Sequence, residues 1–99
     1  MKNDELIRKL NSVGKAAFVE NFSLFKSYAD GLISRTKCID SLVASAVSNM
    51  DGAAIRTSNA ELIFRAGAAR DALEIISKSG RVPADVVSAA RALLKNSVG

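Results

Sequence analysis

Apolar residues recur at helical spacing along almost the whole chain. They return every three or four positions, and no stretch alternates convincingly between apolar and polar residues. The first spacing places apolar side chains on one face of an α-helix, whereas strict alternation would indicate a strand. A length of 99 residues suits one domain with one core. We therefore predict an all-α, single-domain protein: a compact bundle of about five short helices, or six if a glycine divides one of them.

Three helices are predicted in the first half of the chain. The first follows Asn3, a favourable N-cap residue, and Gly14 either ends it or weakens a longer helix. The second ends near Gly31, and the third follows the N-cap residue Ser34 and reaches Met50. Their apolar faces carry, in order, Leu6, Ile7 and Leu10; Phe18, Phe22 and Phe25; and Cys38, Ile39, Leu42, Val43, Ala46 and Val47. The phenylalanine stripe is the largest apolar feature, so we expect it in the core.

A loop is predicted at residues 50–57. Asp51 and Gly52 interrupt the apolar pattern there, and this dipeptide is typical of turns. Immediately afterwards, Ser58 and Glu61 have the spacing of a capping box, in which the two side chains bind the free backbone N–H groups of a helix start. The sequence therefore predicts that a helix begins at Ser58.

Two helices, or three, are predicted after this loop. Gly67 lies within the first apolar pattern and can split it into two helices. Gly80 then ends the pattern and Pro83 opens the last helix, because Gly suits the end and Pro the start of a helix. The tail from about residue 96 is predicted to be frayed. The expected inner faces consist of Leu62, Ile63, Ala66, Leu73 and Ile76, and then of Val86, Val87, Ala90, Leu93 and Leu94.

The core of this bundle is predicted to be thin. Hydrophobic residues make up 48% of the chain, an ordinary share, but much of it is Ala, with four Phe, one Tyr and no Trp. A small chain of this kind can gain stability by association, so we predict a homodimer. Leu24 and Tyr28 lie beside the phenylalanine stripe rather than on it. They are the candidate partner surface, because an amphipathic aromatic ring suits an interface.

Few residues in this chain can carry catalysis. There is no histidine, so the commonest general base is absent. Cys38 is the one cysteine and lies on an apolar helix face, where a thiol behaves as a small hydrophobic group. One Cys without His cannot build the usual zinc site, and the glycines form no phosphate-binding motif. We therefore predict no catalytic residue, no cofactor, no metal site and no enzymatic activity, unless folding brings scattered carboxylates together.

The same features bear on location. A single cysteine cannot form an internal disulfide, and the first residues lack the continuous apolar run of a signal peptide. No window approaches the roughly 20 apolar residues that are needed to span a bilayer. The sequence predicts a cytoplasmic protein that has no membrane partner.

The chain is mildly basic, with a formal net charge of +4 and a pI near 9.6. This charge falls short of the dense basic stripe that is typical of nucleic-acid binders. Arg65 and Arg70 each have a glutamate four residues away, a spacing that supports the helix itself. Four other cations of the second half are candidate contacts to phosphates or to an acidic partner: Arg56, Lys78, Arg81 and Arg91.

Two functional hypotheses follow. The first is a non-enzymatic interaction or regulatory module that self-associates and binds a protein partner through an apolar helix face. The second is a nucleic-acid-binding regulator whose phosphate contacts are the four cations above. The helix that follows Pro83 begins with an acid and is mostly Ala and Val. Because base edges are read by Arg, Lys, Asn or Gln near a helix start, the sequence favours the first hypothesis.

Overall fold

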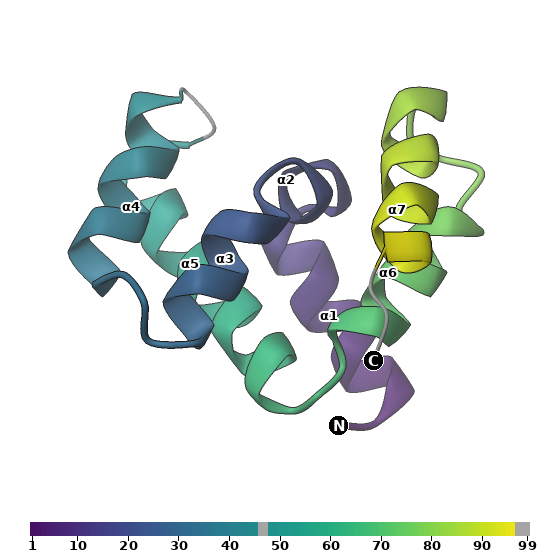
Figure 1. Ribbon diagram of the computed structural model, residues 1–99, viewed down its shortest axis with the longest axis horizontal. Coiled ribbons are helices and arrows are strands. Elements are labelled where there is room, and N and C mark those ends of the chain that lie inside the picture. Colours follow the sequence, from purple (N-terminus) through teal and green to yellow (C-terminus); the bar gives the residue numbers. More distant parts are fainter. Residues whose placement is uncertain (46–47, 97–99) are drawn as a thin grey trace.

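The chain forms an all-α bundle. The computed structural model describes residues 1–45 and 48–96, and this part of the chain contains seven helices and no strand (Figure 1). The helices are α1 (Asn3–Val13), α2 (Lys15–Glu20), α3 (Phe22–Ala29), α4 (Arg35–Ala44), α5 (Met50–Arg65), α6 (Ala69–Ser77) and α7 (Ala84–Asn96). The predicted fold class is confirmed, and the number of helices is higher than the five or six that we expected.

The helices form two groups with α2 between them. The longest helix, α5, packs against α1, α3 and α4, whereas α6 packs against α7. In Figure 1, α3, α4 and α5 lie on the left and α6 and α7 on the right, with α2 in the middle. Because α2 also contacts α1, α3 and α7, this short helix joins both groups.

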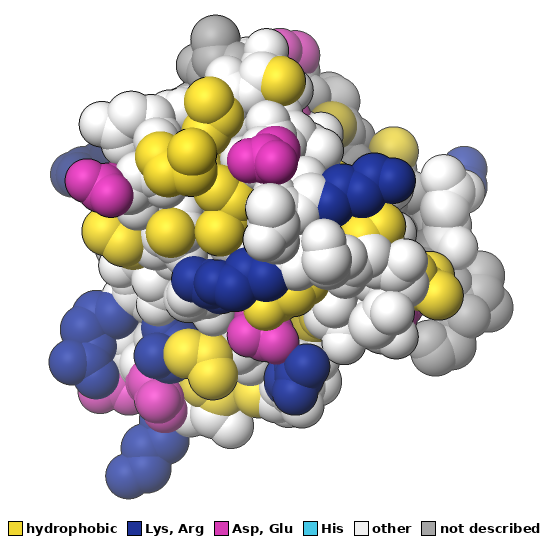
Figure 2. All heavy atoms as spheres, turned by 90° about the vertical axis from the view of Figure 1, so that its left-hand side faces the viewer, with side chains coloured by type: hydrophobic (Ala, Val, Ile, Leu, Met, Phe, Trp, Pro, Cys, Tyr) yellow, Lys and Arg dark blue, Asp and Glu magenta, His cyan; other side chains and the backbone are white. Residues whose placement is uncertain are grey.

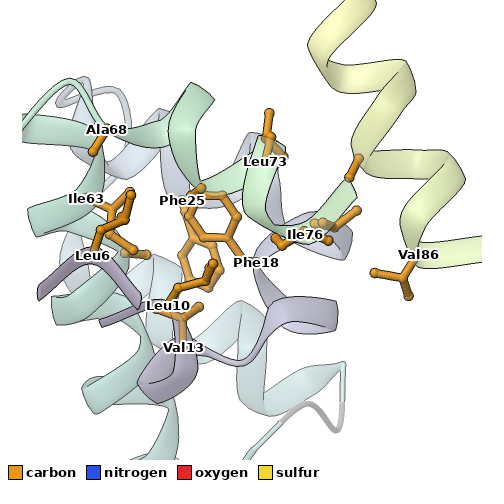
Figure 3. Close-up of a cluster of buried hydrophobic side chains, with 14 of the residues drawn as sticks. Leu6, Leu10, Val13, Phe18, Phe25, Ile63, Ala68, Leu73, Ile76 and Val86 are labelled. Carbon is orange, nitrogen blue, oxygen red and sulfur yellow. The ribbon is translucent and has the colours of Figure 1, made fainter. Parts of the chain in front are cut away.

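The core is centred on phenylalanine rings, as predicted. Phe18 and Phe25 are fully buried, and their rings lie at the centre of the cluster of apolar side chains in Figure 3. Phe22 is only half-buried, but its ring meets that of Phe18 edge-on at 5.7 Å. Phe64 of α5 completes the group, with its ring 5.6 Å from that of Phe18. Aromatic pairs at these separations stabilise a core beyond the area that they bury.

The phenylalanine stripe spans two helices rather than one, which corrects the prediction. The helix breaks at Asn21, whose backbone has φ −115° and ψ 24°. Both the backbone N–H of Asn21 and its side-chain amide donate to the carbonyl of Ala17, at 3.0 and 3.1 Å. Asn side chains compete with the helix for backbone groups in this way, so the break has a local cause.

The loop predicted at residues 50–57 was wrong, because α5 begins at Met50. The side chain of Asn49 accepts a hydrogen bond of 2.8 Å from the backbone N–H of Gly52 and so caps the helix. Asp51 lies in the first turn, where a negative charge suits the helix dipole. Met50, expected near the end of the preceding helix, is therefore the first residue of α5. The expected helical residues 46 and 47 lie outside the described residues.

The capping box predicted at Ser58 and Glu61 was also wrong, since both residues lie inside α5. The hydroxyl of Ser58 accepts a hydrogen bond of 2.8 Å from the guanidinium of Arg35, on α4. The carboxylate of Glu61 pairs with Arg65 at 3.0 Å. Ser58 thus makes a contact between helices and Glu61 an ion pair within α5, so neither side chain caps a helix start.

The other predicted helix ends agree with the structure to within a few residues. Gly14 ends α1 with φ +91°, and Gly67, with φ +70°, separates α5 from α6. Ser34 caps α4 by accepting the backbone N–H of Lys37 at 3.1 Å. Asn3 is the first residue of α1 rather than its cap. Asn96 ends α7, and the rest of the predicted frayed tail lies outside the described residues.

Some residues expected on inner faces lie at the surface. Ile7 is 36% exposed and Leu62 is 47% exposed, and Ala66 is exposed as well. The apolar faces of α1 and α5 are therefore narrower than the sequence pattern indicated.

Cys38 is fully buried on α4, as predicted. Its sulfur lies 3.7 Å from the hydroxyl of Thr57, which is also fully buried. Burial raises the pKa of the Cys38 thiol, and this effect outweighs the hydrogen bond with Thr57 and the charge of Arg35, which lower the pKa. Because the thiolate is the reactive form, burial and a raised pKa agree with the predicted packing role of this side chain.

No helix in residues 1–45 and 48–96 combines the length and the apolar character that crossing a membrane requires.

Candidate functional site: a basic pocket

Arg56 and Arg81, which are 25 positions apart in the sequence, line the same open pocket of about 620 Å³. We call it the basic pocket. Its lining includes the junction of α1 and α2, most of α2, the body of α5 and the loop between α6 and α7. The charged residues in the lining are Lys15, Glu20, Arg56 and Arg81. Three cations and one anion therefore surround one concave site.

The first wall of the pocket depends on Gly14. Arg56 is half-buried and donates a hydrogen bond from Nη1 to the backbone carbonyl of Val13, the last residue of α1. A Cβ atom at Gly14 would lie 2.7 Å from Arg56 Nη1, too close for an ordinary contact. The positive φ of Gly14 is also a conformation that side chains disfavour. Glycine at this position thus allows the guanidinium to reach the carbonyl and the pocket.

The charged residues at the two ends of α2 have the opposite order to the one that the helix dipole favours. Lys15 is its first residue and Glu20 its last, whereas the helix dipole favours acids at the start and cations at the end. In the described part of the chain, neither residue makes an ion pair or a side-chain hydrogen bond. No local interaction explains these two charges, but both line the basic pocket.

Arg81 approaches the pocket from the other side. It lies in the loop between α6 and α7, beside Val82, which also lines the pocket. In Figure 1, this loop and α5 lie on opposite sides of α2. Within residues 1–45 and 48–96, the guanidinium of Arg81 makes no ion pair. The cations of the pocket therefore come from two parts of its lining, one at Gly14 and one at the loop between α6 and α7.

The other two candidate cations do not join this site. Arg91 donates a hydrogen bond of 3.3 Å to the carbonyl of Ser77, the last residue of α6, so it holds α7 against α6. Lys78 is exposed just after α6 and does not line the pocket. The structure thus brings together two of the four cations that the sequence singled out.

Arg65 and Arg70 pair with acids of their own helices, as predicted. The distance between charged atoms is 3.0 Å for Arg65 and Glu61, and 3.7 Å for Arg70 and Glu74. Arg70 also donates to the carbonyl of Leu94 at 3.4 Å. Arg65 thus supports its own helix, whereas Arg70 both pairs within α6 and links α6 to α7.

The most exposed large apolar side chains differ from those that we expected. Leu24 and Tyr28 are half-buried and pack against the core. Exposure is greater at Leu32 (75%), and at Met50 (57%) and Ile55 (55%) of α5. On the side of the molecule that carries α4, hydrophobic side chains gather at the surface in areas that charged side chains interrupt (Figure 2).

Sequence reasoning missed Lys15 and Glu20. The signal that could have found them is their reversed order in the run from Gly14 to Asn21, where a cation opens the helix and an acid closes it. Local rules that fail in this way often mark positions selected for function.

No cluster of three metal-ligating residues is found within residues 1–45 and 48–96. No protein-family model matches the chain, and no curated protein or solved structure matches it. The function must therefore be inferred from the geometry of the basic pocket and of the surface.

Proposed function

We propose that this protein is a non-enzymatic binding module that holds an anionic ligand in the basic pocket. The observation that carries the proposal is the convergence of Lys15, Arg56 and Arg81, from three separate segments, on one concave site. In residues 1–45 and 48–96 none of the three has a carboxylate partner. Cations in a cleft attract anions more strongly than cations on a flat surface, because the low-dielectric walls focus their field.

A small anion fits this arrangement better than a nucleic-acid duplex. A duplex is contacted by cations along an extended surface, but Lys78 and Arg91 lie outside the pocket and Arg91 is engaged with Ser77. These features favour a ligand that enters the pocket.

The test is a titration of the ¹⁵N-labelled protein with inorganic phosphate at constant ionic strength. We expect saturable shifts of amide signals around the pocket, with a dissociation constant on the order of 1 mM. Lys15→Ala should weaken phosphate binding roughly five-fold, about 1 kcal/mol, because it removes one positive charge from the pocket. The Lys15 side chain makes no other contact described above, so the change should affect little else.

Lys78→Ala is the matched control, since it removes an exposed cation outside the pocket. It should leave phosphate binding within two-fold of the wild type, roughly 0.4 kcal/mol. Equal losses in both variants, or shifts that never saturate, would show attraction to net charge rather than a site.

A second candidate function, self-association, is favoured by one observation on α5. Ile55 is 55% exposed, with Asp51 one turn before it and the Arg35 guanidinium, held by Ser58, one turn after it. If two copies met about a two-fold axis at Ile55, Asp51 of each would face Arg35 of the other. An interface of this kind is self-complementary, as symmetric dimers require.

Sedimentation equilibrium between about 10 and 500 µM tests this candidate, because a weak dimer dissociates on dilution. We expect the mass to rise from 10.4 kDa towards twice that value, and Ile55→Asp to remain at 10.4 kDa because it adds a charge at the axis. Leu32→Asp changes a more exposed side chain in the loop between α3 and α4, rather than on α5, and should behave as the wild type. A wild-type mass of 10.4 kDa at every concentration would refute self-association.

A further inference from the structure

The basic pocket is larger than an inorganic anion needs. Its volume of about 620 Å³ lies within the range of sites for organic ligands, roughly 300–1,000 Å³. Ala16, Ala17 and Val82 add small apolar surfaces to the lining. A bare phosphate would leave most of this space filled with water.

The cations of the pocket come from separate parts of the fold. Lys15 follows Gly14, and the Arg56 guanidinium lies against the same glycine, so these two cations share one wall. Arg81 lies on the α6–α7 loop, on the other side of α2 (Figure 1). A ligand that contacts both walls must extend from a phosphate at Lys15 and Arg56 to other polar atoms at Arg81.

Glu20 indicates what lies between the two ends. A carboxylate in an anion site is unfavourable unless it accepts hydrogen bonds from donors of the ligand. Asn21, the next residue, lines the pocket as well, and its amide nitrogen already donates to Ala17, so its oxygen remains as a second acceptor. Neighbouring hydroxyl groups of a sugar are donors that suit such acceptors, as an acidic residue shows when it binds ribose hydroxyls in dinucleotide sites.

We propose that the ligand is a phosphorylated sugar unit, either free or within a nucleotide. The phosphate is bound by Arg56 and Lys15, the sugar hydroxyls donate to Glu20, and Arg81 contacts oxygen atoms at the far end of the ligand. This inference rests on the proposed function, because it assigns chemistry to the same pocket.

The experiment compares inorganic phosphate, ribose 5-phosphate and adenosine 5′-monophosphate in ¹⁵N-labelled wild-type protein and in Glu20→Ala. We expect at least one of the two organic phosphates to bind the wild type about ten-fold more tightly than inorganic phosphate does. Glu20→Ala should weaken that ligand about ten-fold and strengthen inorganic phosphate a few-fold, because the same change removes an acceptor and a repulsive charge. Glu20 is exposed and makes no described side-chain contact, so this variant should fold.

Asp40→Ala is the matched control, since Asp40 is an exposed acid of α4 outside the pocket. It should change no affinity by more than about two-fold. Tighter binding of ribose 5-phosphate would indicate a free sugar phosphate, tighter binding of the nucleotide would indicate a nucleotide, and both results support the inference.

Three results would overturn the inference. If all three ligands bind the wild type equally and Glu20→Ala strengthens all of them, the pocket holds anions but has no sugar subsite, and only the inference fails. If a 12-base-pair duplex binds more tightly than either organic phosphate, nucleic acid replaces the sugar phosphate as the ligand. Absence of binding by every probe, inorganic phosphate included, would refute the proposed function together with the inference.

Discussion

Replacing Phe18 with Ala is expected to lower the free energy of unfolding by about 3–5 kcal/mol. The side chain of Phe18 is fully buried, and its ring lies 5.7 Å from that of Phe22, 6.5 Å from that of Phe25 and 5.6 Å from that of Phe64. These partners belong to α3 and α5, whereas Phe18 belongs to α2. Because three helices meet at this point, the space left by the ring cannot close without moving the helices.

Urea unfolding followed by circular dichroism measures this loss. A domain of this size has a total stability of roughly 5–15 kcal/mol, so the variant should be partly unfolded at low denaturant concentration. Phe22→Ala is the matched control, because the same group is removed from a half-buried position. It should lose less than half as much as Phe18→Ala, about 2 kcal/mol at most. Equal losses would mean that the core is not centred on Phe18.

Gly14→Ala is expected to destabilise the protein by about 1–3 kcal/mol and to weaken phosphate binding. Its φ of +91° is unfavourable for a side chain, and its new Cβ atom would displace Arg56 from the carbonyl of Val13. At roughly 4–8 °C per kcal/mol, the change should be plain in a thermal unfolding curve. The phosphate titration then reports whether Arg56 has left the pocket.

Substitutions at two other glycines distinguish the cost of a positive φ from the cost of displacing Arg56. Gly67 has φ +70°, but no atom lies within 4 Å of the position that a Cβ would take, so Gly67→Ala should show the backbone cost alone. Gly80 has neither a positive φ nor a close neighbour, and Gly80→Ala should leave stability within about 0.5 kcal/mol. We expect phosphate affinity to fall only in Gly14→Ala. If Gly67→Ala lowers stability and phosphate affinity as much as Gly14→Ala does, the contact between Gly14 and Arg56 does not cause the effect.

Several features of the fold could be predicted because they depend on neighbouring residues alone. Ser34 caps α4, Gly67 separates α5 from α6, and Arg65 pairs with Glu61 one turn away. In each case the interacting groups lie within four residues in the sequence, or a glycine adopts a backbone conformation that few other residues tolerate.

Prediction failed at the start of α5. The interruption at Asp51 and Gly52 favoured a start at Ser58, whereas Asn49 caps the helix in the structure. In the structure, the residues between these two candidate caps are helical, because they bury Ala53 and Thr57 against the rest of the bundle. Cap preferences are worth about 1 kcal/mol, so burial of a helix face decides between them.

The sequence by itself determined the all-α class, the buried phenylalanines and the arginine–glutamate pairs within α5 and α6, because each follows from periodicity or from spacing within a turn. Only the tertiary structure decided which of the remaining cations meet. Arg56 and Arg81 reach one pocket, and Arg91 binds the end of α6, although nothing in their immediate neighbours distinguishes them. The physical reason is that a binding site depends on the relative placement of helices, which packing across the whole chain sets.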